Sequence, residues 1–158
     1  MTKSEIIKAI IKQLTHDLKL FLEAAQAAHK AATHEENQPD NKYDTLALEA
    51  SYVAQGQANR AQEIRLSIEA YTNLQPATDT HIIRLTSLVT ITADDGSSRT
   101  VFIGPTEGGM KILDNRTEIT LITPASPLGR ELIGKGVGDY VELYTGTNRL
   151  EYEIVELH

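Results

Sequence analysis

The amino-acid sequence predicts an α+β protein in which a long antiparallel helical hairpin precedes a small, mostly antiparallel β-sheet with one short helix. Two heptad stripes in the first half, a turn-like segment between them, and glycine concentrated in the second half all indicate this class. Nine of the ten glycines follow residue 95, whereas alanines crowd residues 24–70. Because the composition changes near Pro76, we expect a hairpin domain over residues 1–75 and a β/α domain over residues 76–158.

The hairpin is indicated by apolar residues spaced alternately four and three apart, which is the a/d pattern of a coiled coil. The first stripe is Ile7, Ile11, Leu14, Leu18, Phe21, Ala25, Ala28 and Ala32; the second is Tyr43, Ala47, Ala50, Ala54, Gln57, Ala61, Ile64, Ile68 and Tyr71. Residues 34–42 between them hold Pro39 and three Asn or Asp residues, which favour a turn. Two such stripes predict an antiparallel hairpin that is firm at its base and thin at its tip, which we place at about 34–44.

The second half contains short β-like runs separated by turn residues. They cover residues 82–92, 99–104, 117–123, 139–145 and 150–157. One short helix is expected after Ser126, which is a good N-cap, with Pro127 in its first turn and Gly134 ending it. The second half is therefore predicted to form a small twisted sheet, mostly antiparallel, with one helix packed against it.

Charge and composition exclude several function classes. The chain has 22 acidic and 15 basic residues, which give a formal net charge of −7. A net negative charge does not favour binding to the phosphate backbone of a nucleic acid, and we expect no direct sequence-specific DNA binding. It has no cysteine, which removes disulfides, thiolate metal sites and thiol catalysis. Hydrolase and nucleotide-loop motifs are missing, as are a signal peptide and any apolar run near the ~20 residues of a membrane span. We expect a cytoplasmic protein with no membrane partner.

The acidic tip is the most unusual local feature. Glu35, Glu36, Asp40 and Asp44 lie within ten residues, with Lys42 as the single base among them. Oxygen ligands without Cys or His suit a hard cation such as Mg²⁺, but these carboxylates would fill only part of a coordination sphere. The tip would then complete a metal site in another molecule. The alternative is an ordinary solvated polar loop.

Two passages resemble the bacterial transcript-cleavage factors of the GreA/GreB family. The C-terminal residues that carry the resemblance are Ser126, Pro127, Leu128, Gly129, Arg130, Leu132, Ile133, Gly134, Lys135, Gly138, Asp139 and Tyr152-Glu153-Ile154. At the tip, Asp40-Asn41 followed by Tyr43 matches the family's acid-Asn pair and tyrosine, while Asn37 stands where the family has its first acid. The resemblance implies a coiled-coil hairpin followed by an FKBP-like domain.

The resemblance also implies a function. The C-terminal domain would dock on bacterial RNA polymerase at the rim of its secondary channel, with Arg130 and Lys135 as docking candidates. The tip acids Asp40 and Glu36, with Glu35 and Asp44 nearby and Asn37, Asn41 and Tyr43 supporting the loop, would help hold a Mg²⁺ shared with the polymerase. The polymerase would then cleave the 3′ end of a backtracked transcript by two-metal chemistry. The chain would be no enzyme itself and would bind no cofactor alone.

Other interpretations remain open. Asn37 favours a related regulator that enters the channel and inhibits polymerase, or competes with other factors, without stimulating cleavage. A peptidyl-prolyl isomerase needs an aromatic pocket, and the second half offers only Phe102, Tyr140, Tyr144 and Tyr152, which sit in strand patterns suited to a core. A dimeric coiled coil without a catalytic partner is the structural alternative. Arg130 and Lys135 are equally consistent with plain surface charges.

Overall fold

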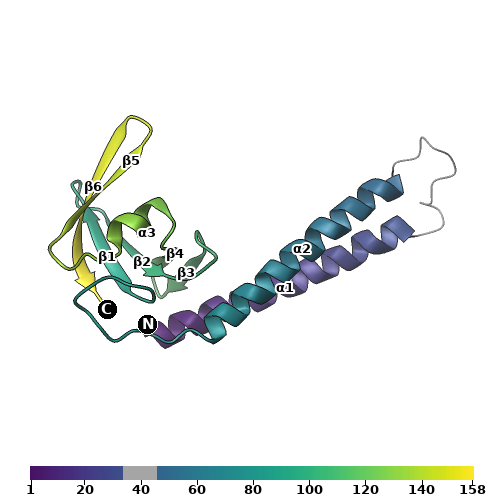
Figure 1. Cartoon of the computed structure of the whole chain (residues 1–158), viewed down its shortest axis with the longest axis horizontal. Helices are drawn as coiled ribbons and strands as arrows, with labels where there is room; N and C mark the ends of the chain where they lie inside the picture. The colour runs from purple at the N-terminus through teal and green to yellow at the C-terminus, as the bar shows by residue number, and fades with distance from the viewer. Residues whose placement is uncertain (34–45) are drawn as a thin grey trace. The chain divides into compact units, whose positions relative to one another are not determined.

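The computed structural model describes residues 1–33 and 46–158 and confirms the predicted fold class (Figure 1). Two long helices, α1 (Lys3–Thr33) and α2 (Leu46–Thr72), precede six strands and the short helix α3 (Pro127–Leu132). By its internal contacts the chain divides into a β-unit, Met1–Ile10 with Ala70–His158, and a hairpin unit, Ile11–Glu69. The first turns of α1 and the end of α2 therefore belong with the sheet. No helix within residues 1–33 and 46–158 is long and apolar enough to cross a membrane.

In the hairpin unit, α1 and α2 lie side by side, and residues of both, such as Ala25 and Ala54, line one shallow hollow. Where the structure describes them, residues of the predicted stripes face the seam. Leu14 and Ile64 are fully buried, whereas Phe21, Ala25 and Ala54 are half-buried. Large side chains thus close one end of the seam and small ones leave the other open, as the sequence indicates. The predicted turn lies outside the described residues.

The buried face of α1 is wider at its start than the heptad predicts. Ile6 and Ile10 lie outside the a/d stripe and are nonetheless fully buried. Both belong to the first ten residues, which cluster with the β-unit. A two-helix seam needs only a narrow stripe, so this wider apolar face indicates that the first turns of α1 pack within the β-unit as well.

The six-stranded sheet has the order β3-β4-β2-β1-β6-β5. Its strands are β1 (Leu88–Ala93), β2 (Ser98–Ile103), β3 (Lys111–Asp114), β4 (Thr117–Ile122), β5 (Tyr140–Thr145) and β6 (Asn148–Leu157). Neighbours pair antiparallel except β2 and β4, which run parallel, so the sheet is mixed. The last strand, β6, lies between β1 and β5.

Two strand predictions differ from the structure. The run predicted over residues 82–92 becomes strand only from Leu88, because Thr86 has a left-handed backbone (φ 75°) that interrupts an extended chain. Thr86 is held there, since its hydroxyl accepts a hydrogen bond from the Ala77 N–H at 2.7 Å and its N–H donates to Ile103 O at 2.8 Å. Strand β3 was not predicted, because its four residues are too short for a clear alternation.

The main core lies between the sheet and α3. It is a cluster of aliphatic side chains with one tyrosine: Ile83, Val89, Ile91, Val101, Ile103, Ile122, Leu128, Leu132, Val141, Tyr152, Ile154 and Leu157. Tyr71, at the end of α2, is fully buried and donates a hydrogen bond from its hydroxyl to Thr106 O at 2.6 Å. Gly104 makes room for this ring, because a Cβ there would lie 2.1 Å from the Tyr71 hydroxyl oxygen. The end of α2 is thereby fastened to the sheet.

Because Tyr71 is buried, we expect the protein to lose stability at alkaline pH. Desolvation raises the pKa of the buried phenol above its ordinary value of 10.0. The unfolded chain then loses the proton above about pH 10 while the folded chain keeps it, so the stability advantage of wild type over Tyr71→Phe should shrink by up to about 1.4 kcal/mol per pH unit. Urea unfolding of both proteins from pH 8 to 11 measures this. A difference that stays constant with pH would contradict it.

Candidate functional site

The acidic tip predicted from the sequence lies outside the described residues. This covers Asp40, Glu36, Glu35, Asp44, Asn37, Asn41 and Tyr43. The structure describes the helices that precede and follow them, of 31 and 27 residues. At 1.5 Å per residue, helices of this length extend about 40–46 Å. Within residues 1–33 and 46–158, no group of three His, Asp or Glu side chains is placed to hold a metal ion.

The second predicted site, around α3, is fully described. The helix begins at an N-cap, where the Ser126 side chain accepts a hydrogen bond from the Gly129 N–H at 3.1 Å. The same hydroxyl donates to Thr123 O at 2.7 Å. One serine thus satisfies a free helix N–H and fixes the turn that leaves β4, as its predicted role as a cap requires.

Gly129 allows α3 to lie close to that turn. A Cβ at residue 129 would stand 1.9 Å from Thr123 O and 2.8 Å from the Ser126 hydroxyl oxygen. On the inner face of the helix, Leu128 is 6% exposed and Leu132 is fully buried, so both are core residues. The close approach and the two leucines together fix which face of α3 points outward.

The end of α3 is joined to the segment that precedes β1. Gly134 has a left-handed backbone (φ 86°), which a side chain would disfavour, and its N–H donates to Ile83 O at 2.9 Å. In return the Ile83 N–H donates to Lys135 O at 2.8 Å. The docking candidates therefore sit on a rigid frame.

The docking candidates differ in exposure. Arg130 is exposed and Lys135 is half-buried, and neither forms an ion pair within the described part of the chain. Ile133 and Val137 lie close to them in the chain and are 38% and 58% exposed. The segment from Arg130 to Val137 thus carries both cationic and exposed apolar side chains.

A hollow of about 330 Å³ lies beside α3, lined by Pro127, Arg130, Glu131, Glu142, Leu143 and Tyr144. Arg149 contacts Glu142, and Tyr144 donates a hydrogen bond to the same carboxylate at 3.1 Å. These two hydrogen bonds hold the pKa of Glu142 below its usual value. Sequence reasoning missed this group, because the cross-strand pairing of β5 with β6 brings Arg149 to Glu142.

The aromatic residues of the β-unit correct one expectation. Phe102 is fully buried and Tyr152 is 7% exposed, so both are core residues, as their strand patterns predict. Tyr140 and Tyr144 are 57% and 69% exposed, because they lie on the outer face of the edge strand β5. Alternation along β5 indicates which residues share a face but does not indicate whether that face is covered.

Comparison with known proteins identifies the class. Residues 78–158, just over half of the chain, match the family described as "Transcription elongation factor, GreA/GreB, C-term". The match includes α3 and the docking candidates Arg130 and Lys135, with Ile133 and Val137; we call these four residues the α3 surface. The chain belongs to the GreA/GreB family of transcription elongation factors, whose partner is RNA polymerase, as the resemblance in the sequence predicted. Members of this family are elongation factors and are not themselves enzymes.

Individual relatives agree with the family. The chain is 26% identical over 161 residues to transcription elongation factor GreA of Rickettsia canadensis (strain McKiel), covering 99% of this chain and 94% of that protein. Among solved structures, Thermus aquaticus Gfh1 is 24% identical with a TM-score of 0.41, and the alignment covers 96% of this chain and 95% of that one. Thermus thermophilus Gfh1 is 25% identical with a TM-score of 0.39, covering 96% of each chain. Both TM-scores are below 0.5, so the family assignment rests on residues 78–158.

The close approach at Gly129 predicts a large effect from a single methyl group. Gly129→Ala should destabilise the β-unit by about 3 kcal/mol or more, because the new Cβ overlaps the Thr123 carbonyl oxygen and neither backbone can move freely. Gly56→Ala is the matched control, since its Cβ meets nothing within 4 Å and alanine favours the helix by about 0.5–1 kcal/mol. Urea denaturation measures both. Equal stability of the two variants would show that α3 is not packed as described.

Proposed function

We propose that this chain stimulates the cleavage of backtracked transcripts by RNA polymerase. Membership of the GreA/GreB family carries the proposal, because it makes the chain a transcription elongation factor. The hairpin supports it: two long helices that pack together at their base flank the acidic segment, residues 34–45. A hairpin of this kind fits entry into the polymerase's secondary channel, with the transcript 3′ end reached only indirectly.

At the tip, Asp40 and Glu36 would supply carboxylate oxygens to a Mg²⁺ shared with the polymerase. The donor set fits a hard cation but is incomplete, so the polymerase's own carboxylates would complete it. A Mg²⁺ ion held there would activate a water and stabilise charge on the phosphoryl group. The chain's contribution is to place two anions, with Asn37, Asn41 and Tyr43 shaping the loop that carries them. It would hold no metal alone.

The α3 surface would dock on the polymerase. Arg130 is exposed and without an ion-pair partner among the described residues, and Ile133 and Val137, which follow it in the chain, are exposed apolar side chains. A cation flanked by apolar side chains gains binding energy when an acidic or aromatic partner surface covers it. Lys135 is half-buried and its backbone is engaged by Ile83, so it would position this surface more than contact the partner.

The second candidate function is inhibition or competition in the channel without cleavage. Asn37 favours it, because a neutral amide stands where the family pattern has its first acid. An amide oxygen is a weaker Mg²⁺ ligand than a carboxylate, since it carries no net charge. Such a factor would occupy the channel and leave the second metal poorly held.

Removing the tip charge tests the main proposal. Asp40→Asn should lower factor-stimulated transcript cleavage by at least about tenfold in a stalled, backtracked elongation complex with Mg²⁺, because a metal ligand is lost. Glu23→Gln, at an exposed position of α1, removes the same charge in the same unit and should keep wild-type cleavage. Arg130→Ala should instead weaken polymerase binding, so that more factor restores cleavage. Full activity of Asp40→Asn would overturn the assignment of the tip.

Restoring the family's acid separates the two candidate functions. If the chain is an inhibitor because of Asn37, wild type binds polymerase without releasing 3′ fragments, and Asn37→Asp should confer release by adding a charged ligand. If the chain already stimulates cleavage, Asn37→Asp should change the rate only modestly. Gln38→Glu, which adds the same charge one residue later, is the control. If wild type releases no 3′ fragments and Asn37→Asp releases none either, residue 37 does not explain the lack of cleavage.

A further inference from the structure

The β-unit contains a polar hollow that the elongation function does not use. It lies where β2 and β4 begin side by side as parallel strands, and it encloses about 340 Å³. Its walls carry two guanidinium groups, several hydroxyls and one carboxylate, from Arg99, Arg116, Ser98, Thr100, Thr117 and Glu118. Arg99 lies on β2 and Arg116 in the turn between β3 and β4, so the sheet topology brings both to the same hollow.

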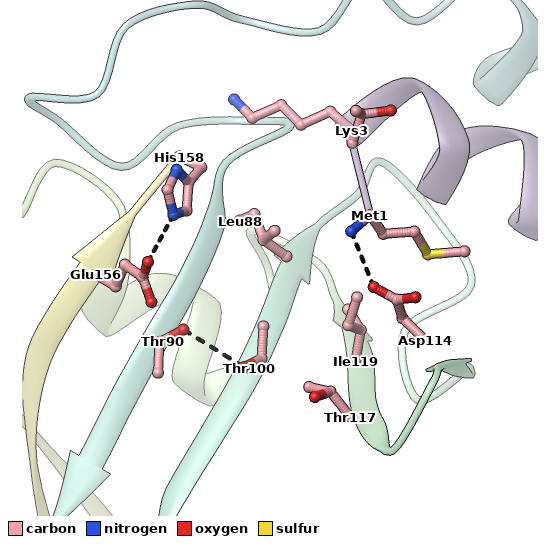
Figure 2. A pocket seen from close by; sticks show the side chains of 11 residues that line it. Met1, Lys3, Leu88, Thr90, Thr100, Asp114, Thr117, Ile119, Glu156 and His158 are labelled. Atoms are coloured by element: carbon pink, nitrogen blue, oxygen red, sulfur yellow. Dashed lines mark hydrogen bonds and ion pairs between the residues drawn. The ribbon is translucent and has the colours of Figure 1, made fainter.

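The hollow continues into a second one on the same sheet. Thr100 and Thr117 also line the neighbouring hollow of about 400 Å³, shown from close by in Figure 2. There the Thr90 and Thr100 hydroxyl oxygens are 3.4 Å apart. Threonines of β1, β2 and β4 thus line the larger hollow, and two of them, Thr100 and Thr117, also line the hollow that holds the two arginines. Each hydroxyl can donate a hydrogen bond to an anion.

The charges around these hollows leave an excess of positive charge. Each acid has a partner of its own: Glu118 lies 3.2 Å from Lys111, Asp114 lies 2.9 Å from the Met1 amine, and Glu156 lies 2.9 Å from His158. Arg99 and Arg116 are exposed and form no ion pair with any described residue. In the same unit, Arg84 and Arg149 do pair with carboxylates.

Two unpaired guanidiniums beside hydroxyl donors are suited to a tetrahedral oxyanion, since the planar fork of arginine binds two oxygens of a phosphate at once. The residues that line this hollow include no aromatic side chain. Recognition of nucleotides or single-stranded nucleic acid generally uses aromatic stacking of the base. We propose that this hollow binds inorganic pyrophosphate, held by Arg99 and Arg116 with the hydroxyls of Thr100 and Thr117.

An NMR titration of the full chain with sodium pyrophosphate tests this without polymerase. At constant ionic strength and without Mg²⁺, the amide signals of Thr100 and Thr117 should shift and saturate. The double variant Arg99→Gln/Arg116→Gln should weaken binding by about 10-fold or more, because two charge-assisted contacts are lost. Arg65→Gln, an exposed arginine of the hairpin unit, is the matched control and should bind as wild type does.

Three results would overturn the proposal. The first is shifts that do not saturate, or that chloride at the same ionic strength reproduces. The second is unchanged affinity in the double variant, provided that its spectrum shows the native fold. The third is tighter binding of ATP or of a short RNA than of pyrophosphate, which would assign the hollow to a nucleotide or to nucleic acid. Thr100→Val, which keeps side-chain volume and removes a hydroxyl, should weaken pyrophosphate binding less than the double variant does.

Discussion

The arrangement of the β-unit depends on the contact between α3 and the turn that follows β4. Ser126 caps the helix and holds the Thr123 carbonyl, and Gly129 leaves the space that this carbonyl occupies. With the helix fixed in this way, Leu128 and Leu132 enter the core and Arg130 is left outside. Ser126 and Gly129, two of the residues that carry the family resemblance in the sequence, make this contact. The resemblance in this stretch therefore has a structural cause, since other side chains would not allow the same packing.

Much of the fold follows from local pattern, and the remainder requires knowledge of strand order. The hairpin and the capped helix are predictable, because a heptad and an N-cap act over a few residues. The parallel pairing of β2 with β4 is not, since each strand's alternation is the same whichever neighbour it has. For the same reason the sequence places Tyr144 on a strand but does not show that it lies at an uncovered edge. The acids of the tip are evident in the sequence, whereas their geometry lies outside the described residues.

Charged side chains are distributed differently in the two halves of the chain. The chain is acidic overall, and four of its acids are concentrated in the segment between the two helices. In the β-unit, by contrast, several carboxylates are engaged by nearby cations, as Glu142 is by Arg149 and Asp79 by Arg84. Exposed ion pairs of this kind contribute little to stability. Their main effect is to leave the remaining cations, Arg130 among them, as the positive groups available to a partner.

The position of β6 has a consequence for how the protein is made. This strand is the last in the chain, yet it pairs with β1 on one side and with β5 on the other. Until residues 148–157 have left the ribosome, β1 has an open edge and the β5 strand has no partner. The hairpin helices depend on local contacts and can form early, but the sheet closes only after residues 148–157 have been made, because β6 pairs with β1, the first strand. A nascent chain that stalls shortly before β6 would expose unpaired strand edges, so residues 148–157 both complete the sheet and cover the edge of β1.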